Sequence, residues 1–301
     1  MVWALLRVWG RLDRINGMFG SLSHQGSSRV LPPAIMAVSG LSLYVGAALA
    51  VGLFDHFPPV VVAWFRIATA GLILWAFFRP RASSFIGRPA LIATFFGVAA
   101  MAMNMTFYMA IQSIPLGSAV AIEFIGPVIV AAWGSRLLRD WLALGFAIAG
   151  VLVISGAQWS AEASGILWAL AAGVFWAGYI LLGAKISSNA DTSKSSLAVG
   201  FTYAGVLGLP LAIWLWPEDL AMAAPTIIGL AAGLGLLSAA IPYSLDQVVL
   251  RLAGSSLFAL LQAVLPLVAT LVGAVALKQW ISLTELAGIA LVILAIVLRK
   301  P

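Results

Sequence analysis

The chain has 301 residues, no cysteine and a formal net charge of +6. Hydrophobic residues make up 63% of it and charged residues only 9%, whereas an average soluble domain has about 25% charged residues. The mean hydropathy is +1.09. This composition predicts an all-α integral membrane protein with no separate soluble domain, and the missing cysteines exclude disulfides and thiolate metal sites.

Residues 1–31 form the longest polar stretch and contain four arginines, three of them interleaved with tryptophan and leucine. The stretch lacks the basic start, continuous apolar run and cleavage site of a signal peptide. We predict a cytoplasmic N-terminal extension. Three alternatives stay open: an amphipathic helix on the membrane surface, a disordered extension, or a start codon placed too early.

Ten apolar segments follow, and Pro, Gly, Ser or charged residues separate them. Most are about as long as a membrane-spanning helix, which needs about 20 residues. The predicted limits are 32–54, 58–78, 89–111, 115–137, 141–157, 164–184, 196–216, 225–245, 254–277 and 281–298.

The basic residues set the predicted orientation, because short cytoplasmic loops carry an excess of Lys and Arg. With the N-terminus inside, 14 of the 16 basic residues fall on the cytoplasmic side, Lys278 falls outside and Arg66 lies within a segment. We therefore expect both termini in the cytoplasm. The net positive charge is explained by topology and lipid headgroups rather than by nucleic-acid binding.

The two halves of the chain also match weakly. A shift of 139 residues places Glu123 on Gln262, Pro127 on Pro266 and Asn104 on Tyr243. An odd number of five segments per half inverts the second copy in the membrane, a plan that recurs in secondary transporters. We predict two inverted five-helix repeats, at 32–157 and 158–301.

The segment from Pro115 to Arg139 carries one acid, Glu123, at membrane depth. A carboxylate there is costly, so it predicts a functional site. Pro127 should bend the helix beside the acid, because proline lacks an N–H and crowds the carbonyl four residues back. Pro266 should do the same beside Gln262. The alternative is an acid that pairs with a basic neighbour and only holds two helices together.

Arg66 is placed at the same depth as Glu123, about 12 Å from the outer ends of their helices. Pairing with Arg66 would keep Glu123 ionised, whereas isolation in an apolar cavity would favour the protonated form. Our hypothesis is that Glu123 binds either a coupling proton or a substrate ammonium. Arg66 would then attract a substrate carboxylate or restrain Glu123.

Four stretches resemble the drug/metabolite transporter superfamily of the EamA type, and within it bacterial threonine/homoserine exporters. They are residues 66–74, 104–117, 120–127 and 241–246. The resemblance spans about residues 32–299 and implies export of small amino acids. The chain departs from the family at Val264-Leu265-Pro266, where Leu-Glu-Pro is common, and at Lys278-Gln279, where Gly-Glu is usual. The second-half acid is therefore missing.

Polar and aromatic side chains in the segments are further candidates for binding a zwitterion or proton. The alternatives for each are ordinary interhelical hydrogen bonding and interfacial anchoring. Asp246 and Arg251 are predicted to form a gate or local ion pair near the cytoplasmic end, and Glu285 is expected to be solvated. The predicted binding residues, with the charged pair, are Glu123, Arg66, Gln262, Asn104, Tyr108, Tyr243, Trp176, Tyr179 and Tyr44.

No enzyme motif, ATP-binding loop or metal-ligand cluster is recognisable; Asp55-His56 alone makes a poor chelate. We therefore predict a secondary transporter of the bacterial cytoplasmic membrane, without cofactor, that exports threonine- or homoserine-like amino acids and is coupled to protons. The alternatives are efflux of another metabolite or a cationic drug, and a passive channel. Substrate, coupling ion and oligomeric state stay open.

Overall fold

The computed structural model describes residues 27–133, 138–187, 190–219, 222–246, 248–249, 261–262 and 264–298. Within these ranges the ordered elements are all helical and no strand occurs, so the predicted all-α class is confirmed. The predicted extension at 1–31 falls mostly outside the described residues, and Arg251 falls outside them as well.

The first half of the chain contains six α-helices and one short 3-10 turn. Their bounds are α2 Ser27–Val51, α3 Pro59–Phe78, η1 Ala82–Phe85, α4 Gly87–Ile111, α5 Leu116–Glu123, α6 Ile125–Trp133 and the start of α7 Leu138–Ser187. α7 is interrupted at Glu162, whose φ of −139° and ψ of 43° are not helical. The predicted segments 141–157 and 164–184 lie on either side of this interruption.

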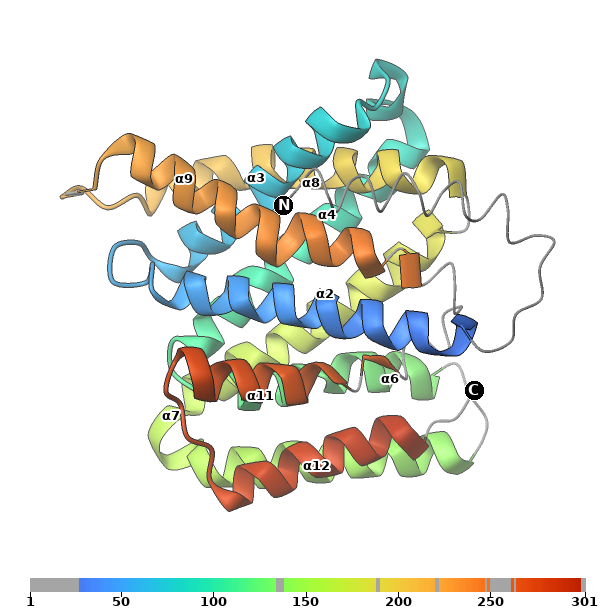
Figure 1. Ribbon diagram of the computed structural model, residues 1–301, viewed down its shortest axis with the longest axis vertical. Coiled ribbons are helices and arrows are strands. Elements are labelled where there is room, and N and C mark those ends of the chain that lie inside the picture. The colour runs from blue at the N-terminus through green and yellow to red at the C-terminus, as the bar shows by residue number, and fades with distance from the viewer. Residues whose placement is uncertain are drawn as a thin grey trace.

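The rest of the chain continues the bundle. Its elements are α8 Ala190–Trp214, α9 Ala224–Gly235, the π-helical turn η2 Leu236–Ala240, a further helical stretch at 241–246, α11 Val264–Ala276 and α12 Leu283–Leu298. The helices run roughly side by side, and the turns between α2 and α3 and between α11 and α12 lie at the same end of the bundle (Figure 1).

Six helices in the described residues are long and apolar enough to cross a membrane. Four shorter apolar helices, of 10–17 residues, lie within the other four predicted segments. The outer surface is rich in exposed apolar side chains, such as Leu152, Val174 and Val275, with exposed fractions of 66–75%. A surface of this kind is unfavourable in water but suits contact with lipid.

Glycines lie where the helices cross most closely. A Cβ on Gly97 of α4 would overlap the backbone carbonyl of Gly200 on α8, and a Cβ on Gly126 of α6 would overlap that of Gly173 on α7. Helices in a membrane gain little from the hydrophobic effect and associate through close van der Waals contact, which small residues allow. These crossings hold α3, α4 and α8 together and fix α5 and α6 against α7.

Candidate functional site

A partly open cavity lies in the middle of the bundle, with about 620 Å³ of empty space including its mouth. Side chains from α2, α3, α4, α5, α7, the stretch 241–246 and Gln262 line it, so both halves of the chain contribute. Eight of the nine predicted binding residues are among the lining residues: Tyr44, Arg66, Asn104, Glu123, Trp176, Tyr179, Tyr243 and Gln262.

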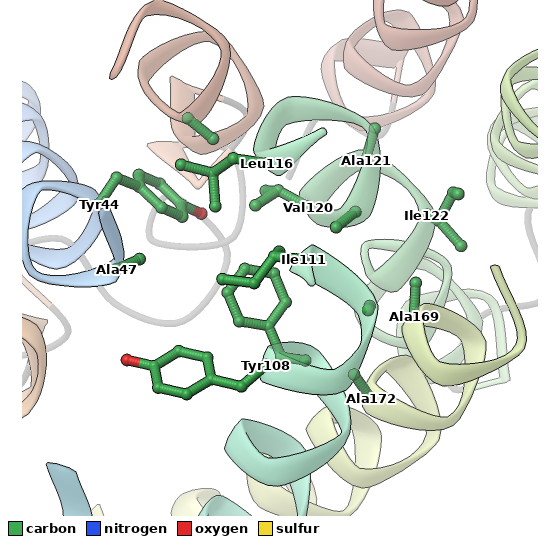
Figure 2. Packing of buried hydrophobic residues seen from close by; sticks show 14 of the residues in the cluster. Tyr44, Ala47, Tyr108, Ile111, Leu116, Val120, Ala121, Ile122, Ala169 and Ala172 are labelled. Atoms are coloured by element: carbon green, nitrogen blue, oxygen red, sulfur yellow. The ribbon is translucent and has the colours of Figure 1, made fainter. Parts of the chain in front are cut away.

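The ninth residue, Tyr108, lies directly behind Arg66. An Nη of Arg66 donates a hydrogen bond to the Tyr108 hydroxyl at 3.4 Å, and the guanidinium lies 5.7 Å from the centre of the ring. Figure 2 shows Tyr44 on α2 and Tyr108 on α4, each directed from its own helix toward the other. Tyr108 therefore orients the guanidinium rather than lining the cavity itself.

Arg66 is only 2% exposed, and its Nε is a buried side-chain nitrogen with no hydrogen-bond partner among the described residues. A buried donor without a partner costs about 1–3 kcal/mol. No ion pair within 4.0 Å joins Arg66 to Glu123 in the described structure. The pairing considered from the sequence is therefore absent in this conformation, because Arg66 is held by Tyr108 instead.

The Glu123 carboxyl group faces the cavity from the last residue of α5. Its residue is 7% exposed, and no described residue donates a hydrogen bond to it. The helix breaks beside it: α5 ends at Glu123 and α6 begins at Ile125. Pro127 has no N–H to bond the Glu123 carbonyl, and Gly173 of α7 packs closely against that carbonyl.

Gln262 also lines the cavity, is 7% exposed and precedes α11, which contains Pro266. The Gln262 carbonyl accepts a short-range bond from the Leu265 N–H at 2.9 Å. Glu123 and Gln262 thus each precede a proline-containing helix, α6 and α11, and both line one cavity.

Aromatic side chains connect the halves between these groups. The Asn104 amide donates to the Tyr243 hydroxyl at 3.4 Å and to the Ala100 carbonyl at 2.6 Å. The Tyr179 ring lies 5.7 Å from that of Tyr243, and Trp176 meets Phe124 edge-on at 4.8 Å. The cavity therefore combines apolar and aromatic walls with a few polar groups, as small-molecule sites do.

Asp246 also lines the cavity. The Ser39 hydroxyl donates to its Oδ1 at 2.7 Å and lies 3.3 Å from the Pro242 carbonyl. The predicted partner Arg251 lies outside the described residues, so the predicted Asp246–Arg251 pair stays a prediction.

Comparison with known proteins agrees with this architecture. The model of the EamA-like transporter family matches residues 163–299. The threonine/homoserine exporter RhtA of Escherichia coli K12 is 33% identical over 275 residues, which is 88% of this chain and 90% of the exporter. The chain belongs to the EamA-like transporter family. The RhtA of Salmonella typhimurium SL1344 is 32% identical over 284 residues, or 90% of this chain and 92% of that protein.

Other relatives extend the comparison. The uncharacterized transporter YwfM of Bacillus subtilis 168 is 27% identical over 63% of this chain and 66% of its own length. A solved crystal structure superposes with a TM-score of 0.62 at 17% identity, covering 89% of this chain and 96% of the other, which shows a shared fold. As an EamA-like transporter, the chain is a multi-pass protein of the bacterial cytoplasmic membrane and not an enzyme.

Several lining residues of this EamA-like chain were not predicted. Leu43 and Ala47 flank Tyr44 on α2, and Met103 and Phe107 flank Asn104 on α4, so helical spacing around the predicted residues was a usable signal. Pro242 and Leu265 complete the wall. Ser39, which holds Asp246, had no sequence signal because its partner is 207 residues away.

The expectation that Glu285 is solvated is wrong, because its residue is only 6% exposed. Its Oε2 accepts bonds from the N–H and hydroxyl of Ser282, at 2.9 and 2.7 Å, and the Glu285 N–H bonds back to that hydroxyl. This is a capping box at the start of α12, and the spacing Ser-x-x-Glu was its sequence signal. Ser118 of α5 adds a bond to Oε1 at 2.9 Å.

A second polar contact ties the same end of α5 to the turn before α12. The Leu116 N–H donates to Oε1 of Gln279 at 3.0 Å, and Gly117 packs against Thr270 and Ile281. The first turn of α5 is therefore joined to α11 and α12. Together with the Ser118–Glu285 bond, these contacts hold α5 against α11 and α12 at this end of the bundle.

Proposed function

We propose that the chain is a secondary active transporter that exports small amino acids of the threonine and homoserine kind, driven by proton influx. The observation that carries the proposal is one cavity with a buried guanidinium, from Arg66, and a carboxyl group without a hydrogen-bond donor among the described residues, from Glu123. A free amino acid carries the complementary pair of charges. The relatives named as threonine/homoserine exporters support this substrate class.

The charge of the cavity favours a small zwitterion over a cationic drug. Arg66 in the wall would repel a cation that has no carboxylate. We assign Arg66 to the substrate carboxylate and Glu123 to the coupling proton or the substrate ammonium, with Gln262, Asn104 and Tyr243 as hydrogen-bonding groups.

We further propose ten membrane spans arranged as two inverted repeats, 32–157 and 158–301, with both termini in the cytoplasm. Residues that are mates in such repeats come together where they lie near the pseudo-two-fold axis. Asn104 and Tyr243, 139 residues apart, are hydrogen-bonded, and Glu123 and Gln262, also 139 apart, line the same cavity. The helix contacts fit the same repeats, in which α3 corresponds to α8 and α4 corresponds to α9. The contact of α3 with α9 then has its counterpart in the contact of α8 with α4.

In this arrangement the end closed by Gln279 and Glu285 is the outer end. The cavity would then be closed to the outside and reached from the cytoplasm, which suits an exporter that is ready to take up its substrate.

The test is efflux of labelled threonine and homoserine from cells that carry wild-type protein, Glu123→Gln or Arg66→Ala, with and without an uncoupler. We expect wild type to lower the intracellular amino acid and the uncoupler and both variants to abolish this. Absence of efflux by wild type would refute the substrate class. Uncoupler-insensitive export with full activity of Glu123→Gln would refute the proton role.

A further inference from the structure

We propose that Asp246, held by Ser39, forms a second cation subsite at the cytoplasmic end of the cavity, which binds the ammonium group of the amino acid before it reaches Arg66 and Glu123. This inference rests on the proposed function. In the second half of the chain, Gln262 occupies the position that corresponds to Glu123 and supplies no carboxylate. The inference assigns Asp246 as the carboxylate of that half.

Asp246 lies apart from the other two charges along the membrane normal. It lies 22 residues after Ala224, the first residue of the membrane-capable helix Ala224–Asp246, whereas Arg66 and Glu123 are each the eighth residue of their helices. Those helices begin at the end of the bundle that carries the α2–α3 and α11–α12 turns. The two carboxyl groups therefore face one cavity from different depths, Asp246 nearer the proposed cytoplasmic entrance.

The local contacts of Asp246 suit a cation. Ser39 fixes Oδ1 through the 2.7 Å bond, and no described residue donates to Oδ2 or forms an ion pair with the carboxylate. The Ser39 hydroxyl thus orients the Asp246 carboxylate, whereas Glu123 has no such donor among the described residues. Within the described part of the chain, Oδ2 is the oxygen left for an ammonium group.

The surroundings favour the same ligand. The side chains of Tyr44, Tyr179 and Tyr243 line the same cavity as Asp246. Aromatic faces and hydroxyl oxygens both attract cations. Arg66 and Glu123 also line this cavity, so the proposed subsite and the central charges share one set of aromatic walls.

The alternative is a purely structural role, in which the Ser39–Asp246 bond only holds α2 against the stretch 241–246. Two substitutions distinguish this structural role from a cation subsite. Asp246→Asn keeps an oxygen that can accept the Ser39 bond but removes the charge. Ser39→Ala removes the bond but keeps the charge. If the role is structural, Ser39→Ala should impair transport more than Asp246→Asn. If Asp246 is a cation subsite, Asp246→Asn should impair transport more.

The experiment measures initial uptake of labelled threonine into inside-out vesicles, which expose the cytoplasmic face, for wild type, both variants and Asp55→Asn. Asp55 is an exposed acid on the α2–α3 turn and serves as the matched control. We expect the apparent KM to rise about tenfold in Asp246→Asn and about threefold in Ser39→Ala, with the control unchanged, because a bond to a charged group is worth about that much.

Inhibition of threonine uptake by two competing compounds supplies a second measurement. A purely structural role of the Ser39–Asp246 bond would not change the two inhibitions differently. A small amino alcohol keeps the ammonium and lacks the carboxylate, and a small 2-hydroxy acid does the reverse. We expect Ser39→Ala to weaken inhibition by the amino alcohol about threefold and to leave inhibition by the hydroxy acid unchanged. This comparison decides the question if Asp246→Asn does not reach the membrane.

An unchanged KM in Asp246→Asn, or equal weakening of both competitors, would overturn the subsite while threonine transport by wild type would still support the proposed function. Wild type that moves neither threonine nor homoserine would overturn both.

Discussion

The two halves of the molecule present the same backbone device with different side chains. On one side a helix breaks beside Glu123, with Pro127 one turn later; on the other Gln262 lies one turn before Pro266. Gln has nearly the shape of Glu but cannot carry a proton as a carboxyl group does. Under the proposed function, the repeated helices would supply the moving scaffold and proton binding would be concentrated in the first half.

The largest expected effect comes from removing the Glu123 carboxyl group. Glu123→Gln makes the two halves alike at this position, and we expect it to abolish accumulation of threonine driven by a proton gradient because the cavity loses the carboxyl group proposed to bind the proton. Exchange of labelled for unlabelled threonine, which needs no net proton movement, should persist. Uptake and exchange in the same vesicle preparation check this. Retained accumulation would mean that Glu123 is not the proton site, and Gln262→Glu is the reciprocal variant.

The second prediction compares Arg66, which lines the cavity, with Thr202, which does not. Thr202 of α8 serves as the control, because it donates to its own helix at Ala198. We expect Arg66→Ala to lower kcat/KM for threonine by about 30-fold, because a buried charge partner of the carboxylate is lost. Thr202→Val should change it less than twofold, about the effect of an ordinary side chain outside the site. Equal effects of the two substitutions would remove Arg66 from substrate binding.

Gly46 and Gly178 test packing rather than chemistry. Each lies two residues after an aromatic residue, Tyr44 or Trp176, yet a Cβ on Gly46 would overlap Ser238, whereas nothing lies within 4 Å of one on Gly178. We expect Gly46→Ala to destabilise the protein by about 1–3 kcal/mol, the usual cost of overpacking. Gly178→Ala should be neutral. Thermal unfolding in detergent measures both, and a loss of stability confined to Gly178→Ala would contradict the packing described.

The smallest expected effect concerns the closed end. Glu285→Gln weakens the bonds from Ser118 and Ser282, each worth about 1 kcal/mol. Phe146, which corresponds to Glu285 in the 139-residue shift, makes none of these bonds and serves as the control. We expect Glu285→Gln to raise the labelling rate of a cysteine placed at Ser113, measured with an impermeant reagent, by a few-fold. Phe146→Leu should leave the rate unchanged. Slower labelling in Glu285→Gln would show that this bond does not hold the end shut.

Local chemistry made much of this protein predictable. The membrane class and the apolar segments follow from hydropathy, and the break at Glu123 lies beside a proline that removes a backbone donor, an effect confined to one helical turn. The capping box of Glu285 was equally local, although the sequence reading placed that residue in solvent.

The rotation of the helices against one another is set by tertiary packing. That rotation brings eight candidate residues to one cavity, turns Arg66 to Tyr108 rather than to Glu123, and places Asp246 within reach of Ser39. Hydropathy carries no information on these contacts, because every face of a membrane helix can be apolar and partners lie far apart in the chain. Residue types therefore fix which groups are costly to bury, whereas the packing of small residues at helix crossings fixes which of these groups meet.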